Sequence, residues 1–264
     1  MSRFSRARKS PTIEGRRAVL EALRAGRETH LILIADGVEP GAQIEEITTS
    51  AHAAGIPIES VNRAELDRRA STKHHQGVIA FVADAQYAPL DGLIESAKSS
   101  GSAPLIVVLD GIQDPQNLGA IARSVDASGA HGMVIPEHRA VGVTPGAIRA
   151  SAGALEHVTV ARVTNLSRAI DQIKKADIWV VGLDMAGERS YTGVDLTRPT
   201  AVVVGSEGEG ISRLVKERCD LLAAIPLRGQ LASLNASVAA GIVLYEAVRQ
   251  RSIPMASPLG RGAS

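Results

Sequence analysis

The sequence predicts an α/β fold: a mostly parallel β-sheet preceded by a second, smaller α/β unit. The first observation is that short apolar runs alternate along most of the chain with segments of helical periodicity, which is typical of strands joined by helices. The second is that runs such as LIVVLD (105–110) and AVVVG (201–205) are almost entirely apolar, as in parallel strands covered on both faces. Hydrophobic residues make up 45% of the 264 residues, enough for a sizeable core.

Residues 12–84 are expected to form the smaller unit. The segment TIEGRRAVLEALRAG (12–26) carries its apolar residues near one face and predicts a helix that ends at Gly26. The rest of this unit alternates in the same way, with helices expected at 41–55 and 64–70 and strands at 30–35, 56–61 and 77–83.

Residues 105–252 are expected to form the larger unit. A stretch rich in Ser, Gly, Ala and Pro at 85–104 predicts a linker with room for one short helix. Strands are expected at 105–110, 132–135, 158–163, 178–183, 201–205 and 221–227, and helices at 117–129, 166–175, 211–218 and 232–251. The ends, 1–11 and 253–264, are expected to be flexible tails.

Composition excludes several classes of protein and site. The single cysteine, Cys219, excludes an internal disulfide framework and a cysteine-built zinc site, and it favours a reduced, cytoplasmic protein. No apolar run is long enough for a membrane span, and the basic start has no apolar segment behind it, unlike a secretory signal. The histidines show no metal-ligand spacing and no G-x-S-x-G elbow occurs, so we expect neither a metal site nor a serine hydrolase.

The net charge of +1 conceals basic ends. Residues 1–27 contain eight Lys or Arg and two acidic residues, and after Glu246 the chain has Arg249, Arg251 and Arg261 and no acid. Such ends suit a polyanion such as RNA. Charge alone equally supports solvated tails without a partner.

Three polar loops follow predicted strands, where an open parallel sheet places its ligands. The first, GIQDPQNLG (111–119), is long, and Asn117 could cap the next helix. Capping does not account for Arg123, six residues further on. Its spacing alone favours a solvated helix residue.

The second loop, GSEGEG (205–210), offers backbone N–H groups before a helix. It matches neither the Walker nor the dinucleotide pattern. A carboxylate such as Glu207 suits a hydroxyl, amine or guanidinium better than a phosphate. In the third loop, Ser233 and Asn235 either cap the last helix or meet a small ligand, and the small residues SVAAG (237–241) suit close packing within the chain or between subunits.

Together these loops resemble the SpoU/TrmH family of RNA ribose 2′-O-methyltransferases. Three motifs occur in the family's order, DPQNLGAIARSVDASGAHGMVI, VVVGSEGEGISRL and IPLRGQLASLNASVAAGIVLYEA, and TPGAIRASAGALEHVTV (144–160) is similar to its middle segment. The front unit, from EGRRAVLEALRAG to HHQGVIAFV, resembles the ribosomal-protein-like substrate-binding domain often fused to this family. The pairing is most similar to the branch that methylates a guanosine of 23S rRNA.

The resemblance implies features that residue patterns alone do not predict. The catalytic domain would carry a deep trefoil knot holding S-adenosylmethionine, and the protein would act as a homodimer with the cofactor sites near the interface. Gly205 would close over the cofactor, Ile225 and Leu234 would line its adenine pocket, and Leu227 and Ser233 would lie nearby.

The family's polar catalytic positions correspond here to Asn117, Arg123, Glu207, Ser233 and Asn235. Because arginine stays protonated in proteins, we interpret Arg123 as a cation that binds an RNA phosphate and stabilises the developing alkoxide, and Glu207 as orienting Arg123 or the hydroxyl. Ser206 departs from the Asn common in the family. A tRNA or another rRNA target, and a non-catalytic RNA-binding relative, are the alternatives, while an unrelated nucleotide-binding protein would need a missing phosphate fingerprint.

Overall fold

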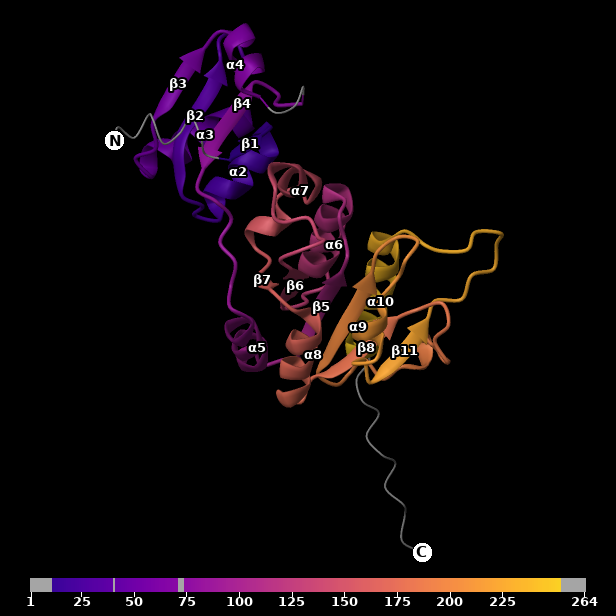
Figure 1. The fold of residues 1–264 in the computed structure, drawn as a ribbon. Helices are drawn as coiled ribbons and strands as arrows, with labels where there is room; N and C mark the ends of the chain where they lie inside the picture. The colour runs from indigo at the N-terminus through magenta and orange to yellow at the C-terminus, as the bar shows by residue number, and fades with distance from the viewer. Residues whose placement is uncertain (1–10, 40, 71–73, 253–264) are drawn as a thin grey trace, which may run out of the picture.

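The computed structural model describes residues 11–39, 41–70 and 74–252, which form two sheets with their helices (Figure 1). The basic residues of segments 1–10 and 253–264 lie outside the described residues. The smaller sheet belongs to the front unit and the larger one to the rest of the chain, in the α/β arrangement that the alternating sequence predicts.

The front unit is a mixed sheet with strand order β1-β4-β2-β3. β4 (Val78–Val82) is antiparallel to β1 (Thr12–Glu14) and to β2 (Thr29–Ala35), whereas β2 is parallel to β3 (Ile58–Val61). Its helices are α2 (Arg16–Arg24), α3 (Ala42–Ala53) and α4 (Arg63–Arg69). Asn62 caps α4 by accepting a hydrogen bond from the Glu65 N–H.

The prediction of one helix over residues 12–26 is wrong at its beginning. Thr12–Glu14 is a strand that pairs with β4, and the helix begins only at Arg16. Gly15 separates the two elements with a φ of 98°, a conformation that glycine adopts without the steric cost that a side chain brings. Helical periodicity in so short a segment did not reveal the strand pairing, which depends on residues more than sixty positions away.

The larger sheet has seven strands among the described residues, in the order β7-β6-β5-β10-β8-β11-β9, and every pairing is parallel. The strands are β5 (Leu105–Asp110), β6 (Gly132–Pro136), β7 (Val160–Val163), β8 (Trp179–Leu183), β9 (Arg189–Ser190), β10 (Thr200–Gly205) and β11 (Leu221–Ala224). The short edge strand β9 had no sequence signal. The parallel sheet confirms what the apolar strands predict.

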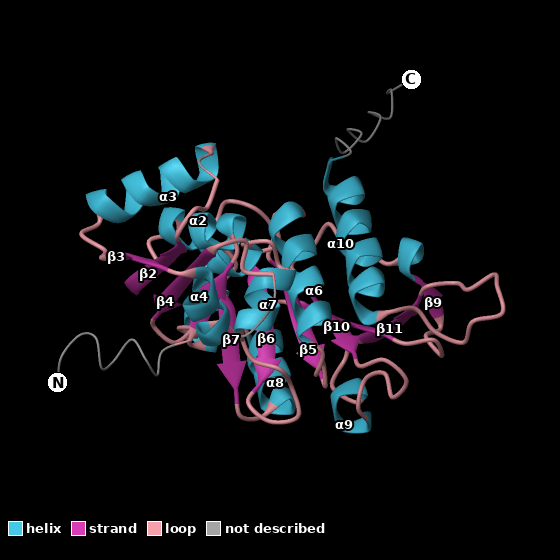
Figure 2. Ribbon diagram, turned by 90° about the horizontal axis from the view of Figure 1, so that it is seen from above, coloured by secondary structure: helices cyan, strands magenta, loops and turns pink. Residues whose placement is uncertain are grey.

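Helices cover both faces of the larger sheet (Figure 2). One face carries α6 (Pro115–Ala127), α7 (Pro145–Ala150) and α10 (Ala236–Ser252), and the other α5 (Leu90–Ser99), α8 (Leu166–Lys175) and α9 (Arg213–Lys216). Alternate strand residues divide between the two cores: Val107 packs with α6 and α10, and Ile106 with α5 and α8. Two short 3₁₀ helices, η1 (Ala154–Glu156) and η2 (Tyr191–Gly193), complete the larger unit.

Three basic residues near the two ends have partners within the chain, while the expected RNA-binding role of the terminal segments falls mainly on residues outside the described ones. Arg251 donates hydrogen bonds to the carbonyls of residues 103, 104, 196 and 198, and Arg249 pairs with Glu246 at 2.6 Å. Near the other end, Arg24 pairs with Glu46 at 2.6 Å. In the part of the chain that the structure describes, no helix is long and apolar enough to span a membrane.

Candidate functional site

The three polar loops meet at one edge of the larger sheet. β5, β10, β8 and β11 are successive neighbours, and parallel pairing brings their carboxyl ends to the same side. Gly205 at the end of β10 lies opposite Asp110 at the end of β5. The loops after residues 110, 183, 205 and 224 therefore emerge beside one another, at the edge where parallel sheets place their ligands.

The first loop ends in a capped helix, but the cap is not the predicted one. Asp114 caps α6 by accepting a hydrogen bond from the Gln116 N–H at 2.9 Å, and Pro115 occupies the first helical position. Asn117 lies within the first turn, so its side chain is free for contacts with other segments. Gly119 has a packing role: a Cβ there would lie 2.5 Å from the Cβ of Ala150.

The second loop is a tight glycine turn. Ser206 and Gly210 exchange backbone hydrogen bonds of 3.0 and 3.1 Å, and Gly208 and Gly210 have φ values of 89° and 67°. A Cβ on Gly205 would lie 2.1 Å from the carbonyl carbon of Gly210. The backbone of this turn therefore folds back on the end of β10, and it leaves Glu207 exposed at the tip.

The third loop leads into α10, which Asn235 caps. Its Oδ1 accepts hydrogen bonds from the backbone N–H and the hydroxyl of Ser237, at 2.9 and 2.6 Å. The expected capping role of Asn235 is thus present. The same side chain also has its amide group directed to the other two loops, so capping and site formation occur together.

Asn117, Glu207 and Asn235 form one hydrogen-bonded cluster, which we call the amide–carboxylate triad. The Asn117 Nδ2 donates to Glu207 Oε1 at 2.9 Å, and the Asn235 Nδ2 donates to Asn117 Oδ1 at 2.9 Å and also to Glu207 Oε1. Two amide donors thus converge on one carboxylate oxygen. Glu207 Oε2 is left to accept a hydrogen bond from a further donor, such as a hydroxyl or a guanidinium.

The other two predicted polar residues do not join the triad. Arg123 is exposed on α6, and among the described residues it has no hydrogen bond or ion pair. The expected contact between Glu207 and Arg123 is not present within the chain. Ser233 lies two residues before Asn235 and lines the adjacent cavity.

A cavity of about 270 Å³ opens beside the triad, close to the lower end of the roughly 300–1,000 Å³ typical of small-molecule pockets. Four predicted cofactor residues line it: Gly205, Ile225, Ser233 and Leu234. Leu227 is not among the lining residues. The wall combines glycine backbone with apolar side chains, which suits a ligand held largely by backbone contacts.

A charged pair that was not predicted from the sequence lies in the cavity wall. Lys216 Nζ lies 2.5 Å from Asp184 Oδ2, and the Asp184 side chain is 11% exposed. Burial raises the pKa of the Asp184 carboxyl, but hydrogen bonds from Lys216 and the Ala186 N–H and the charge of Lys216 lower the pKa more, so the net direction is downward. The sequence feature that could have indicated Asp184 is its position directly after a buried strand, because β8 ends beside the loops after β10 and β11.

Cysteine and metal chemistry have no foundation in the described residues. Burial and the nearby charge of Asp220 raise the pKa of the Cys219 thiol to about 12, which disfavours the reactive thiolate. Within residues 11–39, 41–70 and 74–252, no group of His, Cys, Asp and Glu is arranged to hold a metal ion.

The chain is similar to known RNA methyltransferases over nearly its whole length. Residues 104–245 match the SpoU rRNA Methylase family, and residues 12–88 match the RNA 2′-O ribose methyltransferase substrate binding domain. A putative TrmH family tRNA/rRNA methyltransferase of Bacillus subtilis, YacO, is 45% identical over 90% of this chain and 95% of its own length. An uncharacterized tRNA/rRNA methyltransferase of Mycolicibacterium gilvum is 47% identical over 90% of this chain and 76% of its own.

Solved structures show the same fold and a bound cofactor. The SpoU methyltransferase AviRb of Streptomyces viridochromogenes, in complex with AdoMet, superposes with a TM-score of 0.77 at 28% identity, over 91% of this chain and 90% of its own. An AdoMet-bound rRNA methyltransferase of Sinorhizobium meliloti gives 0.74 at 26% identity, over 91% of this chain and 87% of its own. The residues present here fit that cofactor, since glycine backbone and the apolar side chains of Ile225 and Leu234 line a cavity where the three loops meet. The chain therefore belongs to the SpoU rRNA methylase family, and it is an S-adenosylmethionine-dependent RNA methyltransferase.

Proposed function

We propose that this protein methylates the ribose 2′-hydroxyl of a guanosine in 23S rRNA. The observation that carries the proposal is the amide–carboxylate triad beside the cavity. Asn117, Glu207 and Asn235 come from three loops far apart in the sequence, and they present a carboxylate oxygen toward a further donor. A ribose hydroxyl is a donor of the right kind.

The chain's own residues would orient the hydroxyl and stabilise charge. S-adenosylmethionine supplies a methyl group on a sulfonium, and transfer needs an oxygen aligned with that methyl. Glu207 would accept the hydrogen bond of the 2′-hydroxyl, and then its proton as the methyl group is transferred to the oxygen, while Asn117 and Asn235 hold the carboxylate in place. Arg123, a permanent cation, would bind an adjacent phosphate and stabilise the developing alkoxide.

The cofactor residues are assigned within this proposal by their position in the cavity wall. Gly205, Ile225 and Leu234 would contact S-adenosylmethionine, with Ser233 at the boundary between the cofactor and the ribose. Leu227 is proposed only as a neighbour. The deep trefoil knot implied by the resemblance stays a prediction.

An rRNA target is favoured by the two family matches taken together. Its match is to an RNA 2′-O ribose methyltransferase substrate-binding domain, and the larger unit matches a family named for rRNA. The relatives are described as tRNA/rRNA methyltransferases, so a tRNA or another rRNA is the alternative target. Ser206 is the feature that favours the other alternative, a non-catalytic RNA-binding relative.

A homodimer is proposed from the outer face of α10. Val238 and Tyr245 are 48% and 53% exposed, and their spacing of seven places them on the same helix face. Leu231, in the loop before α10, is also exposed. A second copy packing on this face would bury these two large side chains on the helix that begins next to Asn235 of the triad.

Incubation with labelled S-adenosylmethionine and separated 23S rRNA, 16S rRNA and tRNA tests the proposed target. Because RNA modified in the cell is already blocked at its site, each RNA is also supplied as an unmodified transcript. The proposal predicts label in 23S rRNA alone. Label in tRNA or 16S rRNA would show that the target is a different RNA, while methyl transfer to RNA would stand. No label in any RNA would favour the non-catalytic relative.

A further inference from the structure

The two domains are joined through a largely buried ion pair. Arg27, just after α2 in the substrate-binding domain, donates from Nη1 to both carboxylate oxygens of Glu156 at 2.9 and 3.1 Å. Glu156 is the last residue of η1 in the methyltransferase domain, and the two side chains are only 12% and 4% exposed. Arg27 also donates to the Ala83 carbonyl at 3.2 Å, where the chain leaves the first domain.

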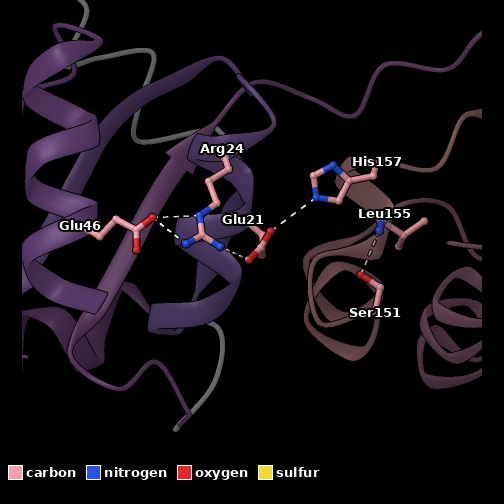
Figure 3. Close-up of polar contacts among 6 residues, drawn as sticks. All are labelled: Glu21, Arg24, Glu46, Ser151, Leu155 and His157. Atoms are coloured by element: carbon pink, nitrogen blue, oxygen red, sulfur yellow. Dashed lines mark hydrogen bonds and ion pairs between the residues drawn. The ribbon is translucent and has the colours of Figure 1, made fainter. Parts of the chain in front are cut away.

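A second contact lies beside this pair. Figure 3 shows Glu21 of α2 between Arg24, on its own helix, and His157, which follows η1. The Glu21 Oε2 to His157 Nε2 distance is 3.5 Å. A Cβ at Gly153, which precedes η1, would lie 2.6 Å from the Cβ of Glu21. Helix α2 therefore lies directly against the backbone of the methyltransferase domain.

The contact between the two domains also includes apolar side chains. Ile13 of β1 and Val19 of α2 belong to the same continuous core as Ile148 of α7 and Leu155 of η1. β1 packs against α7, and Figure 1 shows α7 between the front domain and α6. The core thus continues from one domain into the other.

The segment of α7 and η1, which contacts the front domain, also packs against the helix that carries Asn117 of the triad. α7 and η1 pack against α6, and the closest approach is at Gly119, where a side chain would overlap Ala150 and the backbone of Ser151. Gly119 is two residues from Asn117 on the same helix. A shift of α7 and η1 relative to the front domain would thus change where the bound RNA lies relative to Asn117.

Burial of this ion pair indicates a role in geometry. Removing two charges from water costs much of what their attraction gains, so such a pair is weak evidence for stability, and specifying an arrangement is its better supported use. Arg27 holds both carboxylate oxygens of Glu156 through Nη1 and the Ala83 carbonyl through Nη2, so its planar guanidinium fixes orientation as well as distance. Apolar contacts alone would tolerate small rotations between the domains.

We propose that the Arg27–Glu156 pair is a positioning contact that fixes the substrate-binding domain on α7 and η1, so that RNA held by the first domain presents its ribose to the triad in the second. This inference rests on the proposed function. Because neither residue lies at the triad or the cavity, breaking the pair should reduce turnover without removing the cofactor site. Misplacement of a substrate by about 1 Å can cost 10²-fold in rate.

Charge reversal with rescue tests the proposal on the full-length protein. The single variants are Arg27→Glu, Glu156→Arg and Arg27→Lys, the last of which keeps the positive charge but loses the planar guanidinium. The double swap combines Arg27→Glu with Glu156→Arg. The matched control is Arg218→Glu, which breaks the exposed Arg218–Asp171 pair within the methyltransferase domain. Each is assayed for kcat and KM on the 23S rRNA transcript, for S-adenosylmethionine binding by calorimetry, and for its solution scattering profile.

Each reversal is expected to lower kcat at least about 10-fold, with KM and cofactor Kd within twofold and a larger radius of gyration, and the double swap to restore kcat. Arg27→Lys keeps a positive charge beside Glu156 and is expected to lower kcat by a smaller factor. Unchanged kcat in Arg27→Lys and the single reversals, or losses that the double swap does not restore, would overturn the positioning role. A wild-type protein that methylates no RNA would instead overturn the proposed function. The scattering and cofactor measurements on the variants would still test whether the ion pair fixes the arrangement of the two domains.

Discussion

The Asn117 Nδ2 lies 2.9 Å from Glu207 Oε1, although ninety residues separate them in the chain. Asn117 is in the first turn of α6, after β5, and Glu207 is at the tip of the glycine turn after β10. The parallel pairing of these neighbouring strands produces the contact, and Asn235 completes it from the third loop. The order of the strands in the sheet therefore brings these three side chains together.

Glu207→Gln should abolish most of the methyl transfer while the cofactor still binds. The amide keeps the size of the side chain but removes the negative charge, and with its oxygen facing the Asn117 and Asn235 donors, its NH₂ group replaces the Oε2 acceptor. Loss of one oriented polar group of this kind costs about 10²-fold in rate. Steady-state kinetics and calorimetry on the same preparation check this, and turnover within twofold of wild type would exclude Glu207 from the reaction.

Gly205→Ala should weaken cofactor binding. The new methyl would lie 2.1 Å from the Gly210 carbonyl carbon, and because this is backbone, the glycine turn must move. Gly193→Ala is the matched control, since nothing lies within 4 Å of its Cβ. Calorimetric titration with S-adenosylmethionine should show at least about a tenfold weaker Kd for the first variant only, and equal affinity in both would refute the packing argument.

Arg123→Ala should abolish methyl transfer and leave cofactor affinity unchanged. The side chain is exposed and forms no ion pair within the described chain, so its removal should cost little stability. The loss of a cation at a phosphate should also reduce the salt dependence of RNA binding. Filter binding at several salt concentrations and a turnover assay check both effects, with Arg218→Ala as the control, and retained turnover would remove Arg123 from the catalytic residues.

Acid should destabilise the fold through His131. Burial lowers the pKa of this imidazole below its usual 6.5, the Leu105 carbonyl partly opposes the shift, and the positive charge of Arg251 reinforces it. The unfolded chain therefore binds the proton first as pH falls below 6.5, so stability is complete above that pH and declines below it. Tm measured from pH 5 to 8 should fall less steeply in His131→Asn than in wild type, whereas the exposed control His52→Asn should keep the wild-type slope.

Most of the larger domain could be predicted because its signals are local. Apolar runs such as 105–110 and 201–205 became parallel strands with helices on both faces. Short elements with few residues were missed: Thr12–Glu14 read as part of a helix, and β9 has only two residues. Their formation depends on pairing with distant strands, which local periodicity does not report.

Spacing alone could not assign the site residues. Asn117 looked like a helix cap, but Asp114 fills that position and leaves Asn117 for the triad. Asn235 both caps α10 and belongs to the triad. Asp184 was missed because its neighbours in the cavity wall come from other loops. The motifs in the family's order were what connected Asn117, Glu207 and Asn235 before their contacts were known.

The position of the transferred methyl group tests the central claim most directly. The protein is incubated with labelled S-adenosylmethionine and an unmodified 23S rRNA transcript, and the product is hydrolysed with alkali. A 2′-O-methyl group blocks cleavage of the adjacent phosphodiester, because that cleavage needs a free 2′-hydroxyl. We predict the label in an alkali-resistant dinucleotide that begins with guanosine, and label recovered in mononucleotides, as methylation of a base would give, would contradict the account.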